Sequence, residues 1–274
     1  MAARRGRAGG GSSDKPGAAR PALLDTWHVE PRALRGYPRK TSEFVARQIL
    51  ADIVSRGLRP GDQLLPEAAM LEEYGVGRPS LREALRILEV HGLITIKPGP
   101  RGGPTVGGVD PAHFARTMTL YFQLANATFG HLMQARLLLE PVMCGLVAES
   151  RDPEAMRMLQ ESLDAAAGID LSDDRKYSSV VADFHSVVAS VSGNPVLDIV
   201  SRGLKEIFTD RVTTALNPSE TREQVRRDHE RIAKAIFSGN SRLAERLMRE
   251  HLQQTWDLLQ RRQPRLFDEQ LIWE

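Results

Sequence analysis

The sequence contains a single cysteine, Cys144, among its 274 residues. One cysteine cannot build a disulfide framework, and its position in an apolar helical stretch indicates a core residue. No apolar run approaches the roughly 18 residues needed to cross a bilayer, and the N-terminus lacks the apolar segment of a secretory signal. We therefore expect a cytoplasmic protein without a membrane partner, in a reducing compartment.

An excess of charge of one sign is also absent, because 37 Lys and Arg residues face 35 Asp and Glu residues, a net charge of +2. This balance hides an asymmetry. Residues 1–109 hold 17 basic and 11 acidic side chains, a balance of +6, whereas residues 110–274 hold 20 and 24, a balance of −4. The basic N-terminal part favours phosphate binding, and the length predicts about two domains.

The segment Leu65–Val106 has the order helix, tight turn, second helix and small hairpin. Pro66 can begin a helix, since the N–H that it lacks would be unpaired in the first turn. Gly75 ends this helix, where a left-handed residue costs glycine little. Apolar residues spaced by three, four and seven positions predict the buried face of the second helix: Leu81, Ala84, Leu85 and Leu88.

Arginines occupy another face of the second helix, four residues apart: Arg78, Arg82 and Arg86, called here the arginine stripe. Like charges at this spacing repel one another in an isolated helix, but phosphate oxygens or guanine edges would turn the repulsion into binding. A β-type run (residues 93–96), a turn with two cations (97–103) and a returning strand (104–106) follow. This order predicts a winged helix-turn-helix with one helix in the major groove of DNA; a solvated amphipathic helix and a loop is the alternative.

The strings GDQLLPE and LEEYGVGRPSLREALRILEVHGLI resemble the N-terminal domain of the GntR family of bacterial transcription regulators, over residues 41–106. The resemblance implies a set of operator-contacting positions in the helix and the wing: Arg78, Ser80, Arg82, Lys97 and Gly99. The arginine stripe adds Arg86. One position departs from the family, since Ala68 follows Glu67 where relatives often carry a polar or charged residue, and this leaves the operator sequence open.

Four segments follow from composition and periodicity. Residues 1–38 are expected to be a disordered basic tail, 39–108 the winged helix-turn-helix domain, 109–262 an all-helical domain, and 263–274 a C-terminal tail. The predicted fold class is mainly α, with a bundle of six or seven helices after the wing. Helix breaks are predicted near residues 126–128, 151–153, 168–173, 193–195, 217–218 and 239–240.

Three histidines interrupt apolar helix faces in the second domain: His185, His229 and His251, called here the histidine cluster. A buried polar group without a partner costs about 1–3 kcal/mol. Three converging neutral imidazoles satisfy one another poorly and a divalent metal such as zinc well. The alternative is that each imidazole is satisfied separately by a carbonyl group or a neighbouring side chain.

Arg136 is a further inward polar residue, on a largely apolar helix face. Glu140, four residues later, is placed to form an ion pair with it. The guanidinium group is equally suited to bind a carboxylate ligand through two hydrogen bonds. The two interpretations are compatible if Glu140 orients the arginine.

The strings ARLLLEPVMCGLVAE, DFHSVVASVSGNPVL, DHERIAKAIFSGN and AERLMREHL resemble the effector domain of the FadR-type (FCD) subgroup of GntR regulators, over residues 110–260. The resemblance implies that the histidine cluster binds a divalent metal and that Arg136 binds a small carboxylate effector. The metal-binding aspartate of relatives lies four residues before the first histidine, where this chain has Val181. Asp183 lies about 200° around the helix from His185. Either the metal has three protein ligands, or the site binds an organic anion alone.

The two resemblances predict a ligand-responsive DNA-binding regulator, not an enzyme, that acts in the bacterial cytoplasm at the nucleoid. A homodimer, acting as a repressor, would bind an inverted-repeat operator, and a small carboxylate metabolite would modulate its affinity. One alternative is a constitutive DNA-binding protein with a structural bundle. The other is a three-histidine metal hydrolase, which needs a general base; the sequence indicates no carboxylate on the three inward faces.

Overall fold

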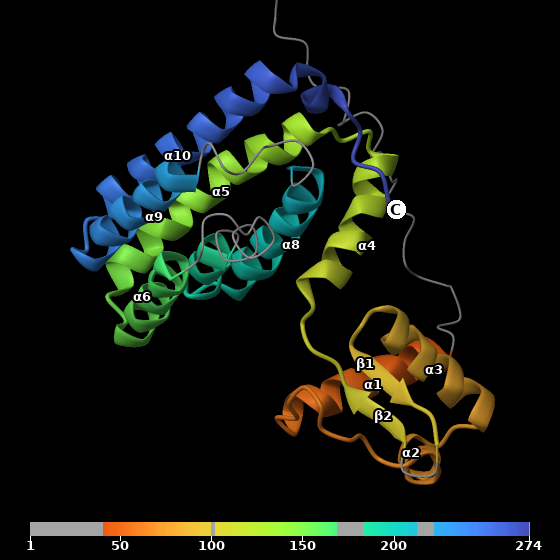
Figure 1. Ribbon diagram of the computed structural model, residues 1–274. Helices are drawn as coiled ribbons and strands as arrows, with labels where there is room; N and C mark the ends of the chain where they lie inside the picture. The colour runs from red at the N-terminus through yellow and green to blue at the C-terminus, as the bar shows by residue number, and fades with distance from the viewer. Residues whose placement is uncertain (1–40, 100–101, 169–182, 213–221, 274) are drawn as a thin grey trace, which may run out of the picture. The chain divides into compact units, whose positions relative to one another are not determined.

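The computed structural model describes residues 41–99, 102–168, 183–212 and 222–273 (Figure 1). The predicted tail of residues 1–38 lies outside them. The first described part consists of three helices and a two-stranded antiparallel hairpin: α1 (Thr41–Ser55), α2 (Glu67–Tyr74), α3 (Arg78–Val90), β1 (Ile94–Lys97) and β2 (Gly103–Val106).

The turn between α2 and α3 follows from two residues. Gly75 ends α2 in the left-handed conformation, with φ of 60°, and its N–H donates to the Leu71 carbonyl. Pro79 lies in the first turn of α3, where backbone N–H groups have no partner within the helix, so the N–H that proline lacks is not needed. The predicted face of α3 is buried: Leu81, Ala84, Leu85 and Leu88.

This first part has its own hydrophobic core. Side chains of α1, α2, α3 and β1 meet in it, among them Ile49, Met70, Leu81 and Ile94. The hairpin pairs residue 94 with 106 and residue 97 with 103, so the strands flank a short turn. The predicted winged helix-turn-helix is therefore confirmed.

The second described part is entirely α- and 3-10-helical in its regular elements. Seven α-helices occur among its described residues, which agrees with the predicted six or seven: α4 (Pro111–Leu124), α5 (Phe129–Ser150), α6 (Pro153–Ala167), residues 183–190, α8 (Pro195–Val212), α9 (Arg222–Phe237) and α10 (Ser241–Arg262). Helix α10 lies along α5, α9 packs against both, and α4 packs against α8 (Figure 1).

Four of the predicted breaks coincide with residues in the left-handed conformation: Asn126, Arg151, Gly193 and Gly239. The next helix is then capped by a polar side chain, as by Asp152 before α6 and Asn240 before α10, each of which accepts a backbone N–H. The break at residues 217–218 lies outside the described residues, and that at 168–173 lies almost wholly outside them.

The C-terminal segment is more ordered than the sequence suggested. A 3-10 helix, η3 (Pro264–Asp268), follows α10 and buries Leu266 and Phe267. The Leu271 N–H donates to the Ala127 carbonyl at 2.9 Å, and Leu271 is buried. This segment therefore belongs to the core between α4, α5 and α8. Among the described residues, no helix combines the length and hydropathy needed to cross a membrane.

Substitutions on the buried face of α3 should destabilise the protein far more than substitutions on its exposed face. Leu81→Ala should lower the free energy of unfolding by about 2–5 kcal/mol, because Leu81 is fully buried. Arg82→Ala should change it by no more than about 0.5 kcal/mol, because its side chain is 70% exposed. Urea unfolding monitored by circular dichroism measures both, and equal destabilisation would contradict this assignment of faces.

Candidate functional site

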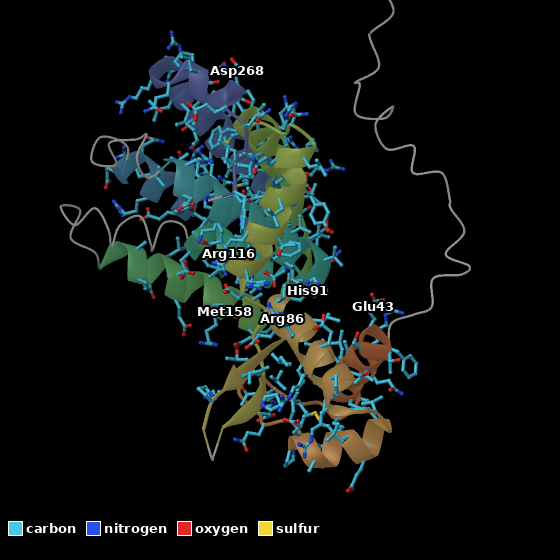
Figure 2. The ribbon with its side chains drawn as sticks, turned by 90° about the vertical axis from the view of Figure 1, so that its right-hand side faces the viewer. Glu43, Arg86, His91, Arg116, Met158 and Asp268 are labelled. Carbon is cyan, nitrogen blue, oxygen red and sulfur yellow. The ribbon has the colours of Figure 1, made fainter. Side chains whose placement is uncertain are left out.

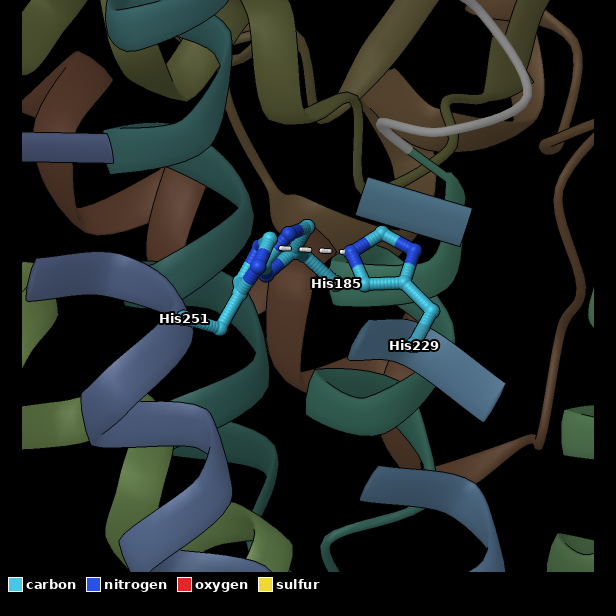
Figure 3. Close-up of side chains that lie close together, drawn as sticks. All are labelled: His185, His229 and His251. Carbon is cyan, nitrogen blue, oxygen red and sulfur yellow. Dashed lines mark hydrogen bonds between the residues drawn. The ribbon is translucent and has the colours of Figure 1, made fainter. Parts of the chain in front are cut away.

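The histidine cluster is brought together from three helices (Figure 3). His185 lies on the helix of residues 183–190, His229 on α9 and His251 on α10. One potential ligand atom from each ring lies within 4.8 Å of the other two. The Nε2 atoms of His229 and His251 are 3.3 Å apart. The predicted convergence of the three side chains is therefore observed.

Burial disfavours the charged form of two histidines of this cluster, His229 and His185. His229 is 3% exposed, and its ring stacks on Phe184 with centroids 4.1 Å apart. Burial, together with the nearby His251 and His185, lowers the pKa of His229 well below its ordinary value. Burial also lowers the pKa of His185, although Glu140 opposes this effect. A neutral imidazole has a lone pair available for a metal.

Two carboxylates contact the outer nitrogens of the cluster, contrary to the expectation from the helix faces. Glu140 of α5 places Oε2 2.6 Å from Nδ1 of His185. Asp228 of α9 places Oδ2 3.6 Å from Nδ1 of His251, within ion-pair range but beyond a hydrogen bond. The expectation that the three inward faces carry no carboxylate is therefore wrong for α9, where the buried Asp228 reaches across to His251. Glu140 comes from a fourth helix, α5, which that expectation did not include. Carboxylates in this position orient metal-binding histidines and raise their basicity.

The donor set fits a divalent metal. With the Nδ1 atoms of His185 and His251 directed at carboxylates, their Nε2 atoms are the ring nitrogens left for a metal, and Nε2 of His251 lies 3.3 Å from Nε2 of His229. Three imidazole nitrogens are a common zinc ligand set, with a fourth position for water or another ligand. Val181 lies outside the described residues. Asp183 is exposed, whereas Phe184 and Val188 are buried, as expected if Asp183 lies off the inward face.

Arg136 extends this polar group along α5. Its side chain is buried, with 3% of the residue exposed, and its Nε lies 2.5 Å from Oε1 of Glu140. The guanidinium carbon lies 4.0 Å from the centre of the Phe208 ring, a cation–π contact. Nη1 is buried and has no hydrogen-bond partner among the described residues. Arg136 thus forms the expected ion pair and still has a donor for an anion.

The environment of Glu140 favours its ionised form. Burial acts to raise its pKa, but the neighbouring Arg136 and His185 outweigh burial and hold the pKa at about 2. The two carboxylate oxygens contact Arg136 and the first histidine of the cluster, His185.

In the N-terminal part, the arginine stripe is exposed along α3, with Arg86 labelled in Figure 2. Arg82 lies 3.6 Å from Glu67 of α2, an ion pair open to solvent. Lys97 and Gly99 are exposed at the hairpin turn, where Gly99 has a φ of 108°. Ser80 is half-buried in the first turn of α3. The predicted contact positions thus lie on α3 and on the wing.

Known families match both parts of the chain. Residues 41–102 match the bacterial regulatory proteins of the gntR family, and residues 131–254 match the FCD domain. The arginine stripe falls in the first match. Arg136 and the histidine cluster fall in the second.

Individual relatives agree with these matches. The chain is 30% identical to the uncharacterized HTH-type transcriptional regulator YcbG of Bacillus subtilis (strain 168), covering 78% of this chain and 88% of that one. It is 31% identical to the HTH-type transcriptional repressor NanR of Enterobacter sp. (strain 638), covering 60% and 65%. The solved structure of Streptococcus agalactiae GntR shares the fold, with a TM-score of 0.65 and 23% identity, covering 79% and 99%.

Fold and relatives together define a helix-turn-helix transcription regulator with a C-terminal helical domain. The chain belongs to the GntR family of bacterial regulatory proteins, and its second part is an FCD domain.

The lowered histidine pKa values predict a pH dependence of stability for the metal-free protein. Unfolding restores the pKa of His229 to about 6.5, so the unfolded state binds more protons below that pH. The contribution of His229 to stability should therefore fall with acidification from about pH 6.5, by about 1.4 kcal/mol per pH unit while the folded histidine remains neutral. Chemical unfolding of the wild type and His229→Gln between about pH 5 and 7.5 measures this. An equal slope in both proteins would contradict the prediction.

Proposed function

We propose that this protein is a ligand-responsive transcription regulator, a repressor, that binds an inverted-repeat DNA operator as a homodimer. The observation that carries the proposal is the division of α3 into two faces, with Leu81 and Leu88 buried and the arginine stripe exposed. A recognition helix needs this division, because one face holds the helix in the domain and the other reaches base edges and phosphates.

The ion pair between Arg82 and Glu67 supports a role at the DNA surface. Arg82 has a partner in the free protein, but that partner is weakly held, since both side chains are largely exposed and 3.6 Å separates the atoms. A phosphate or a guanine edge offers a stronger, charge-assisted contact. Breaking the contact of Arg82 with Glu67 in order to contact DNA would therefore cost little free energy.

Exposed apolar residues in the helical domain support a homodimer. Leu138, Val142 and Leu146 repeat every four residues on α5 and are exposed, with Leu138 65% exposed. An apolar stripe of this kind on a soluble domain is typical of a protein–protein contact. A second copy of the chain is the proposed partner, because a twofold dimer presents two recognition helices to the two half-sites of an inverted repeat.

The proposed effector is a small carboxylate, bound by Arg136 beside a divalent metal on the histidine cluster. The unpartnered Nη1 of Arg136 and the three converging imidazoles support this assignment. A metal held by three histidines keeps a coordination position for a carboxylate oxygen. The ligand would change operator affinity only if it binds one of two arrangements of the protein more tightly than the other.

The relatives favour a regulator over an enzyme, since YcbG is named as a transcriptional regulator and NanR as a transcriptional repressor. Glu140 and Asp228 do supply carboxylates beside the cluster, but both face outer histidine nitrogens rather than an open metal position. They suit ligand orientation better than general-base catalysis. Operator binding that no effector changes would instead indicate a constitutive DNA-binding protein.

Arg82→Ala should weaken binding to the specific operator by about 1–3 kcal/mol, because it removes a contact of the recognition helix. Fluorescence anisotropy with an operator selected from a random DNA library measures the effect. Arg157→Ala is the matched control, since Arg157 is an exposed arginine of α6 in the FCD domain and should leave affinity unchanged. Wild-type affinity of the Arg82 variant would remove this residue from the contact set.

His229→Ala should reduce bound zinc from about one equivalent per chain to near zero, because two imidazoles and water hold the ion far less tightly. The variant should keep operator affinity but lose the response to effector. Elemental analysis after zinc loading gives the metal content, and His91→Ala is the control, since His91 lies outside the cluster. A wild-type protein without zinc after loading would refute the metal site.

A further inference from the structure

Glu140 contacts two groups that the proposed function assigns to different ligands. Its Oε1 accepts a hydrogen bond from Nε of Arg136 at 2.5 Å, and its Oε2 lies 2.6 Å from Nδ1 of His185. All three side chains are almost fully buried. One carboxylate of α5 therefore joins the arginine proposed to bind an anion to a histidine proposed to bind a metal.

We propose that Glu140 is a positioning residue for both ligands of the effector site. This inference rests on the proposed metal and anion binding and adds the residue that organises it. Glu140 does not itself reach the metal or the effector in this proposal. It determines which ring nitrogen of His185 carries the proton and in which direction Arg136 presents its remaining donors.

The tautomer of His185 follows from the hydrogen-bonding chemistry. Oε1 of Glu140 is ion-paired with the guanidinium of Arg136, and a carboxylate can only accept hydrogen bonds. Nδ1 of His185 therefore carries the proton that it donates to Oε2. The neutral ring then has its lone pair on Nε2. His185 can thus offer Nε2 to the metal without first moving a proton, which matches the second-layer role of carboxylates at zinc sites.

The orientation of Arg136 follows from the other carboxylate oxygen. Oε1 holds Nε, and Phe208 lies against the guanidinium plane at 4.0 Å. These two contacts restrain rotation of the group and leave Nη1 buried without a hydrogen-bond partner among the described residues. A buried guanidinium donor without a partner is costly, and an anionic ligand would relieve that cost.

Glu140→Gln provides a sharp test, because the amide has the same shape but only one accepting atom. Arginine has no acceptor, so the amide oxygen of Gln must face Nε of Arg136. The amide NH2 then faces Nδ1 of His185 and requires a lone pair there. His185 should switch to the tautomer protonated at Nε2, which blocks its metal-binding atom.

The experiment combines two measurements on the full chain. In [15N]histidine-labelled, metal-free protein, two-dimensional NMR should show His185 protonated at Nδ1 in the wild type and at Nε2 in Glu140→Gln. Competition with a chromophoric chelator should show zinc affinity reduced about 10- to 100-fold in the variant. Glu149→Gln, an exposed glutamate on the same helix, is the control and should leave both readouts at wild-type values.

Several results would overturn the proposal. The first is protonation of His185 at Nε2 in the wild type, which needs no variant and therefore holds even if Glu140→Gln does not fold. The second is an unchanged tautomer in the folded variant, and the third is an unchanged zinc affinity. Failure of the wild type to bind zinc would instead refute the proposed metal site, while the tautomer measurement would still test the role of Glu140.

Discussion

The buried carboxylate of Glu140 joins α5 to the helix that carries the first histidine of the cluster in the FCD domain of this protein. A charge removed from water costs several kcal/mol unless it is paired and fully hydrogen-bonded. Glu140 meets this condition only with Arg136 and His185 on either side. The relative positions of α5 and the helix of residues 183–190 are therefore tied to the hydrogen bond between Glu140 and His185. An apolar side chain at position 140 would not need partners in particular directions. The charge of Glu140 therefore specifies how the surrounding helices are arranged, although its burial costs stability.

The two domains use arginine in opposite ways, and the difference follows from burial. Arg82 is 70% exposed, and its ion pair with Glu67 is solvent-screened and weak. Arg136 is buried, and its contacts with Glu140 and Phe208 fix its direction. A mobile, exposed cation suits a long polyanion that presents many phosphates. A rigid, desolvated guanidinium suits a single small anion, because orientation and low dielectric strengthen each hydrogen bond.

Local periodicity was sufficient to predict much of this molecule. The buried face of α3 and the inward direction of the three histidines follow from a repeat of 3.6 residues, and glycines and caps mark most helix ends. The contact of Glu140 with His185 could not be predicted in this way, since 45 residues separate them. Such a contact depends on how α5 and the 183–190 helix are aligned. Asp228 was missed for the same reason, because its partner His251 belongs to the neighbouring α10.

The origin of the site residues on separate helices explains how the proposed ligands would act on the whole domain. A metal ion on the histidine cluster would join the 183–190 helix to α9 and α10, and an anion on Arg136 would act on α5, against which Phe208 of α8 is packed. Glu140 connects these two sets of contacts. Any ligand that prefers one alignment of these helices must stabilise that alignment by its differential binding energy. By thermodynamic linkage, an operator that prefers the other alignment must weaken ligand binding by the same factor.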